Sequence, residues 1–311
     1  MIKDNRMMRA IITKFILIGC CCGVAVESTA QKQRTQYVML DMLDSLYDLN
    51  RYTLNAQDLY GVDETIEIYN IHAAGLVLFS ILPDFTSDKN WSEVDLNEIQ
   101  DQVFGERSLR RELGNRIASE NSKDKKTLQY SLVKSEGGKY FRSNQCLAEF
   151  FFIDTYPSLF NVPYGTINTG QDTLSIQQMK NVYRETLNIP GQWSFPMDVR
   201  WLGGTLLLPN RLLLQREYLS REFEIDGEKA YQFWTFTDWN THDGYNLHRG
   251  IDRFIYMPEK GVVGGSYDFW FLYFDTWSNP PIERKRNNKT KEELWQNVLE
   301  EKVMLAEELK R

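Results

Sequence analysis

Hydrophobic residues recur at helical steps in the first third of the chain. Between residues 35 and 60, leucine and methionine side chains follow one another three or four positions apart, with aspartates between them. This spacing is typical of one face of an amphipathic helix. A second helical pattern covers residues 96–118, with Gly105 as a possible interruption. The pattern therefore predicts a helical part over about residues 35–118.

The apolar stretch from residue 65 to residue 82 lies inside this part and stays ambiguous. It is compatible with a buried helix or with two short strands, because a continuous apolar run has no diagnostic period. Further along, TLQYSLV and KYF flank SEGG, the composition of a hairpin. CLAEFFFIDTY, which begins at Cys146, continues as a predicted core strand.

The pattern then changes to a two-residue alternation over residues 199–274. Asp226 and Gly227 supply a tight turn between two alternating segments, since glycine tolerates the positive φ angles that such turns need. The turns are too short for crossover helices, which favours antiparallel pairing. The sequence thus predicts a β-rich part over about residues 127–277.

A last amphipathic pattern closes the chain over residues 291–310. Thr290 and Glu293 match the capping box that begins a helix. Leucine and valine side chains form one stripe, which we expect to dock on the protein's own core; presentation to a partner is the alternative. The expected fold class is therefore α+β: N-terminal helices packed on a mainly antiparallel β-meander sheet, followed by a C-terminal amphipathic helix, all in one domain over residues 31–311.

Residues 1–30 have the composition of a signal peptide rather than of a domain. Lys14 precedes a short apolar run from Phe15 to Val26, and small residues lead to a cleavage site after Ala30. The run is too short for a comfortable membrane span. Cys20 lies in a sequence similar to a lipoprotein lipobox, so a lipid anchor there is the alternative. Both interpretations predict an exported bacterial envelope protein, periplasmic, secreted or membrane-anchored, without a transmembrane span after processing.

The charge and the cysteines narrow the possible partners and crosslinks. The formal net charge is −7, and the leader is itself basic, so the processed chain is more acidic still. An acidic domain repels phosphate backbones, which excludes nucleic acid as an expected partner. After cleavage Cys146 is the one remaining cysteine, so the domain must be held by its core rather than by a disulfide.

The segment from Thr237 to Phe254 concentrates groups that could bind a metal ion or carry out acid–base chemistry. Imidazoles and carboxylates are the ligands of zinc and iron sites. The metal candidates are Asp238, His242, Asp243 and His248, with Asp252 as a further carboxylate. His242, His248 and Asp243 are also the catalytic candidates. Their spacing matches no motif with a built-in geometry, so a solvated hairpin connection is the preferred interpretation.

Aromatic residues are dense toward the end of the β-rich part. Fifteen of the 47 residues from Tyr231 to Trp277 are Phe, Tyr or Trp, against 13% of the whole chain. Most are expected in a thick core. Three aromatic residues near predicted strand ends are the candidates for a ligand-binding surface: Trp239, Tyr245 and Trp277.

No signature of a serine hydrolase, a P-loop or a dinucleotide site occurs in the chain, and Cys146 is expected in a buried strand rather than as a nucleophile. The first functional hypothesis is a non-catalytic envelope protein that binds a protein or a glycan and needs no cofactor. The alternative is a hydrolase assisted by a divalent metal at the 238–252 loop. A weaker third hypothesis is an assembly component that uses the C-terminal helix.

Overall fold

The chain divides into two units at residues 34 and 35, and the second unit, residues 35–311, is described here. The computed structural model describes residues 35–84, 89–121, 124–157, 164–179, 181, 217–237, 250–271 and 287–310. Within these ranges no helix is long and apolar enough to cross a membrane.

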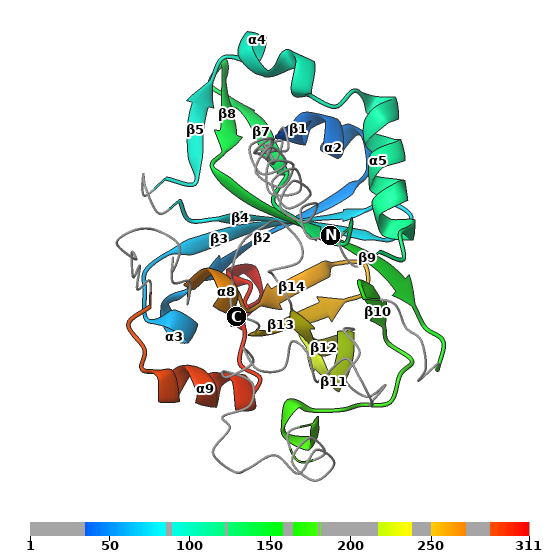
Figure 1. The fold of residues 1–311 in the computed structure, drawn as a ribbon, viewed down its shortest axis with the longest axis vertical. Helices are drawn as coiled ribbons and strands as arrows, with labels where there is room; N and C mark the ends of the chain where they lie inside the picture. The colour runs from blue at the N-terminus through cyan, green and yellow to red at the C-terminus, as the bar shows by residue number, and fades with distance from the viewer. Residues whose placement is uncertain are drawn as a thin grey trace, which may run out of the picture. The chain divides into compact units, whose positions relative to one another are not determined.

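A six-stranded sheet forms the middle layer of the second unit (Figure 1). Its strands in spatial order are β10 (Thr166–Asn168), β9 (Gln145–Asp154), β4 (Leu76–Leu82), β3 (Thr65–His72) and β2 (Asp48–Asn55), with β6 (Lys126–Thr127) also paired to β9. Side chains on adjacent positions of this central sheet enter opposite cores. In β4, for example, Leu78 belongs to one core and Phe79 to the other. Both faces are buried, which explains why the strand is apolar at every position except Ser80, whose buried hydroxyl is hydrogen-bonded to that of Tyr267.

One face of the central sheet is covered by two helices and a four-stranded sheet. The helices are α2 (Leu40–Leu46) and α5 (Glu106–Ala118). The strands are β1 (Gln36–Met39), β7 (Tyr130–Glu136), β8 (Lys139–Ser143) and β5 (Trp91–Val94). Helix α5 contributes Leu109, Leu113 and Ile117, which recur at helical spacing and are all buried against the sheet.

The opposite face of the central sheet packs on a five-stranded antiparallel sheet. Its strands are β11 (Glu217–Ile225), β12 (Glu228–Thr237), β13 (Gly250–Met257), β14 (Gly261–Gly265) and β15 (Met304–Leu305). Asn70 of β3 joins the two sheets directly. Its side-chain amide donates to the carbonyl of Val262 at 2.8 Å and its oxygen accepts the N–H of Val262 at 2.7 Å.

The remaining helices are short. They include α3 (Gln57–Tyr60), α4 (Leu96–Ile99), α8 (Asp268–Phe271), α9 (Lys291–Leu299) and the 3₁₀ turns η1 (Gln100–Gln102) and η6 (Glu307–Leu309). The prediction of N-terminal helices packed on one meander sheet is therefore wrong. The described protein is mostly β, with three sheets and few, short helices.

The error arose largely between residues 35 and 60, where the helical pattern covers only α2. The chain leaves that helix at Tyr47 and runs as β2 through residues 48–55, paired to β3 over its whole length. The ambiguous stretch that follows is resolved as the two strands β3 and β4. Strand pairing satisfies the backbone hydrogen bonds of these segments with distant partners, which a local helical period does not reveal.

The C-terminal helix is shorter than expected. The Thr290–Glu293 capping box is present, and α9 packs on the protein's own core through Leu294 and Val298, which confirms the start and the docking. The helix ends at Leu299, however, and the chain then forms β15 and η6. Tertiary contacts at Glu301 explain the early end. Its backbone has a φ of 55°, and its carboxylate accepts the N–H of Ile176 at 2.6 Å.

Several local predictions are confirmed. β7 and β8 form a hairpin closed by Gly137 and Gly138, both with positive φ. β11 and β12 form a second hairpin around Asp226 and Gly227, with φ angles of 53° and 80°. Gly105 interrupts the second helical pattern as the residue before α5.

Candidate functional site

A layer of charged side chains lies buried between the central sheet and the five-stranded sheet. The ammonium of Lys126, in β6, lies 2.6 Å from Oδ2 of Asp252 in β13 and 2.8 Å from Oε1 of Glu149 in β9. Burial alone would lower the pKa of Lys126, but the two carboxylates raise it well above its ordinary value. Lys126 is therefore a fixed positive charge that cannot act as a base near neutral pH.

Only one oxygen of the Asp252 carboxylate, Oδ2, contacts Lys126. Its Oδ1 atom is buried and has no hydrogen-bond partner among the residues that the structure describes. A cavity of about 20 Å³ lies beside it and is also lined by Lys126, Glu149 and Ser266, which leaves room for about one water molecule. Burial raises the pKa of Asp252, and the charge of Lys126 opposes this effect.

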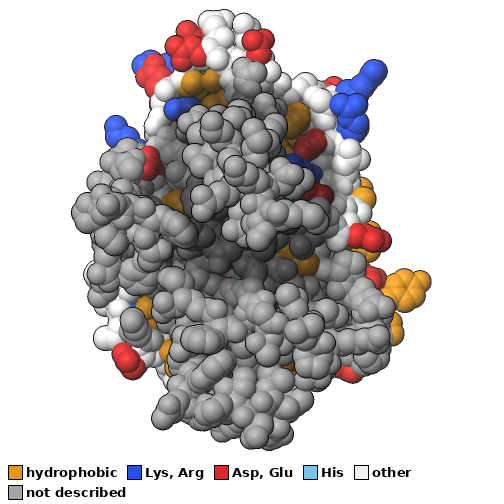
Figure 2. Space-filling view, viewed as in Figure 1, with side chains coloured by type: hydrophobic (Ala, Val, Ile, Leu, Met, Phe, Trp, Pro, Cys, Tyr) orange, Lys and Arg blue, Asp and Glu red, His pale blue; other side chains and the backbone are white. Residues whose placement is uncertain are grey.

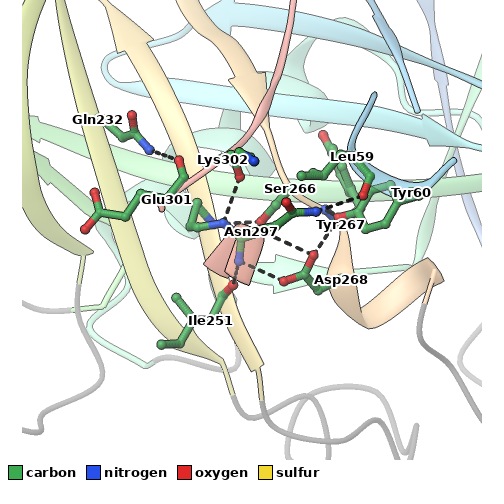
Figure 3. Close-up of polar contacts among 11 residues, drawn as sticks. Leu59, Tyr60, Gln232, Ile251, Ser266, Tyr267, Asp268, Asn297, Glu301 and Lys302 are labelled. Atoms are coloured by element: carbon green, nitrogen blue, oxygen red, sulfur yellow. Dashed lines mark hydrogen bonds and ion pairs between the residues drawn. The ribbon is translucent and has the colours of Figure 1, made fainter. Parts of the chain in front are cut away.

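A second ionic group, drawn in Figure 3, is centred on Arg253, the residue that follows Asp252 in β13. The guanidinium of Arg253 donates to Oδ2 of Asp268 at 2.8 Å and to the carbonyl of Lys302 at 2.9 Å. The hydroxyl of Tyr60 donates to Oδ1 of Asp268 at 2.7 Å and accepts the N–H of Tyr267 at the same distance. Burial first, and the neighbouring Asp268 second, raise the pKa of Tyr60 well above 10.

These two groups of buried ion pairs hold the central sheet and the five-stranded sheet together and do not form an open reaction site. We call them the ionic clamp. Their side chains come from β6, β9, β13, α8 and α3, which are distant in the sequence, so the ion pairs fix the sheets against each other. Each of the two cations is paired with a carboxylate. The cavity has no room for an organic substrate, which excludes substrate chemistry at this position.

Cys146 lies on the other face of the central sheet and is 3% exposed. Burial raises the pKa of its thiol to about 12. The interpretation as a core residue is confirmed, because a nucleophilic cysteine needs an accessible thiolate at working pH.

Most of the residues predicted for a site lie outside the described residues. They are Asp238, Trp239, His242, Asp243, Tyr245, His248 and Trp277. Asp252 is the one described member of the proposed metal loop, and it is directed into the core toward Lys126. Within the described part of the chain, no group of three or more His, Cys, Asp or Glu side chains could hold a metal ion.

Two aromatic side chains at the end of β9 are exposed instead. Phe152 is 48% exposed and Tyr156 is 74% exposed, the only large hydrophobic residues so exposed in the described ranges. Figure 2 shows hydrophobic side chains protruding at the margin of the molecule, on the side where β9 and β10 end in Figure 1. The sequence prediction missed this pair because Phe152 belongs to the apolar run FFF. Pro157 was the available sequence signal that the strand ends near these two residues.

The backbone that presents these rings is held by side-chain hydrogen bonds. Oδ1 of Asp154 accepts the N–H groups of Thr155 and Tyr156 at 2.7 and 3.0 Å. The side-chain amide of Asn168, in β10, donates to the carbonyl of Tyr156 at 2.9 Å. Gly170 packs so closely on the carbonyl of Thr155 that a Cβ atom would lie 2.3 Å from it. The exposed rings therefore stand on an ordered backbone.

Comparison of the chain with protein-family models, with curated proteins and with solved structures finds no match.

Proposed function

We propose that this protein is an exported, non-catalytic envelope protein that binds a glycan on the aromatic pair Phe152 and Tyr156. The observation that carries the proposal is the exposure of both rings on a hydrogen-bonded backbone at the end of a central strand. The face of an aromatic ring carries partial negative charge and attracts the C–H groups of a sugar ring. Rigid presentation lowers the entropy that binding must overcome.

A glycan fits this surface better than a protein partner. A stable protein interface buries about 800 Å² on each partner and contains a closely packed apolar centre. Two separate rings supply much less apolar area than such a centre. A sugar ring needs one or two aromatic faces with polar groups beside them, and Asp154 and Thr155 lie between the two rings in the chain.

Co-sedimentation with insoluble polysaccharides tests the proposal. The processed chain, residues 31–311, is mixed with peptidoglycan sacculi, chitin and cellulose in separate assays. We expect retention by at least one of them. An aromatic stacking contact is worth about 0.5–1.5 kcal/mol, so losing two such contacts by replacing Phe152 and Tyr156 together with alanine is expected to weaken binding by roughly 5- to 150-fold.

Two matched variants control the assay. Tyr156→Phe keeps the ring and is expected to bind nearly as well as the natural protein. Glu222→Ala removes an exposed side chain of β11, in the five-stranded sheet, and is expected to leave retention unchanged. Unchanged thermal unfolding shows that each variant is folded. Equal retention of the double alanine variant, or no retention of the natural protein by any polysaccharide, would refute the proposal.

Export itself is supported by the leader-like composition of residues 1–30. The mass of the protein purified from bacterial cells tests it. A mature chain beginning at Gln31 is expected, and a diacylglyceryl group on Cys20 is the alternative. An intact leader on the purified protein would contradict both.

A further inference from the structure

Glu217, the first residue of β11, is a buried carboxylate whose partners are backbone N–H groups. It is 1% exposed. Its Oε2 accepts the N–H of Gly165 at 2.8 Å and that of Thr166 at 3.0 Å, and its Oε1 lies 3.0 Å from the same Gly165 nitrogen. Gly165 immediately precedes β10 and Thr166 is its first residue, so Glu217 holds the start of this short strand.

No cation of the described residues forms an ion pair with Glu217, although two lysines are near. The ammonium of Lys126 is already bonded to Asp252 and Glu149. The ammonium of Lys125 donates a hydrogen bond to the carbonyl of Ile117. Among the residues that the structure describes, the buried phenol of Tyr164 also faces Glu217. The negative charge of an ionised Glu217 is therefore balanced mainly by amide dipoles, and burial disfavours it.

β10 connects this carboxylate to the exposed aromatic pair. The carbonyl of Gly165 accepts the N–H of Phe152 at 2.8 Å. The strand then pairs in parallel with β9 as far as Asn168 and Asp154. The side-chain amide of Asn168 in turn donates a hydrogen bond to the carbonyl of Tyr156. Movement at the start of β10 would therefore reach the backbone on both sides of the proposed glycan site.

We propose that Glu217 is a proton-controlled latch: when its carboxyl loses the proton, β10 loosens, and with it the backbone that presents Phe152 and Tyr156. The reason is linkage. Ionisation strengthens the hydrogen bonds from the Gly165 and Thr166 amides, but in a buried position without an ion-paired cation the lost hydration of the carboxylate outweighs them, so ionisation favours every opening that hydrates Glu217. The aromatic site is therefore best ordered at mildly acidic pH and less ordered above neutrality. The gating of a glycan rests on the proposed function, whereas the loosening of the backbone does not.

Hydrogen–deuterium exchange measured by mass spectrometry tests the latch without any ligand. Uptake in peptides covering residues 150–157 and 164–169 is followed at pH 6, 7 and 8 and corrected for the intrinsic rate of amide exchange. Protection in the natural protein is expected to fall about tenfold between pH 6 and pH 8. In Glu217→Gln, which cannot ionise, protection is expected to be independent of pH. Glu222→Gln, an exposed change in the same strand, is the matched control and should behave as the natural protein does.

Equal protection of the natural protein at pH 6 and pH 8 would overturn the latch, as would a fall of the same size in Glu217→Gln. A fall confined to residues 164–169 would overturn the connection to the aromatic pair. Polysaccharide retention measured over the same pH range separates the two proposals. Absence of retention at every pH refutes the glycan function but does not affect the hydrogen-exchange test of the latch, which uses no ligand. Retention that does not weaken with pH while both peptides lose protection would refute the gating.

Discussion

Replacing Glu217 with glutamine is expected to remove a pH dependence from the free energy of unfolding. Burial raises the pKa of the Glu217 carboxyl from 4.5 to about 7, against the opposing effect of the backbone N–H groups and of Lys126. Because the folded protein binds this proton more tightly than the unfolded chain does, protonation stabilises the fold. The stabilisation is fully present below about pH 4.5 and is lost as the pH rises through about 7.

The magnitude follows from the two pKa values. A tenfold difference in proton affinity corresponds to about 1.4 kcal/mol, so a pKa of about 7 in place of 4.5 is worth about 3 kcal/mol in total. About 2.5 kcal/mol of this falls between pH 5 and pH 8. That is a large part of the 5–15 kcal/mol typical of a folded domain.

Urea denaturation followed by tryptophan fluorescence measures the effect. The free energy of unfolding is determined for the natural protein and for Glu217→Gln at each pH, and the difference between the two proteins is plotted against pH. Glutamine does not titrate, so its own cost is a constant offset, and other groups cancel in the difference. The natural protein should lose about 2.5 kcal/mol relative to the variant. Parallel curves would show that Glu217 titrates alike in the folded and unfolded states and would refute the reasoning.

Three other measurements test the structure and the remaining hypothesis. Lys126→Met leaves Asp252 buried without its counter-charge and should lower the free energy of unfolding by about 3–5 kcal/mol, so a loss below about 1 kcal/mol in urea denaturation would contradict the ionic clamp. Cys146, with a thiol pKa of about 12, should react with a thiol reagent at pH 8 only after unfolding. Metal analysis of the purified protein tests the loop hypothesis: stoichiometric zinc, manganese or iron that is lost when His242 and His248 are replaced would support the metal-assisted hydrolase. A metal-free protein that is indifferent to both changes would eliminate it.

The candidate site was the part least accessible to sequence reasoning. The sequence hypothesis placed a ligand-binding surface on aromatic residues near predicted strand ends. It did not include Phe152, which lies inside an apolar run whose other members, Phe150 and Phe151, are fully or almost fully buried. Its exposure depends on which elements cover the end of β9. Likewise, nothing near Lys126 in the sequence indicates Asp252, which lies 126 residues away.

Local sequence by itself determined the features whose hydrogen bonds close within a few residues. The Gly137–Gly138 and Asp226–Gly227 turns need positive φ angles, and the box of Thr290 with Glu293 satisfies the first amides of α9. For the same reason these features agree between the sequence and the structure.

Only the tertiary structure decided which segments became strands and where helices ended. Residues 48–55 form a strand because every one of them pairs with a residue of β3. Residues 304–305 pair with β14 because Gly264, which has no side chain, lets the carbonyl of Met304 approach closely. The burial of Glu217 beside β10 was decided in the same way. Buried backbone groups and charges need hydrogen-bond or ionic partners. When those partners are distant in the chain, the local sequence pattern does not show which partners will be used.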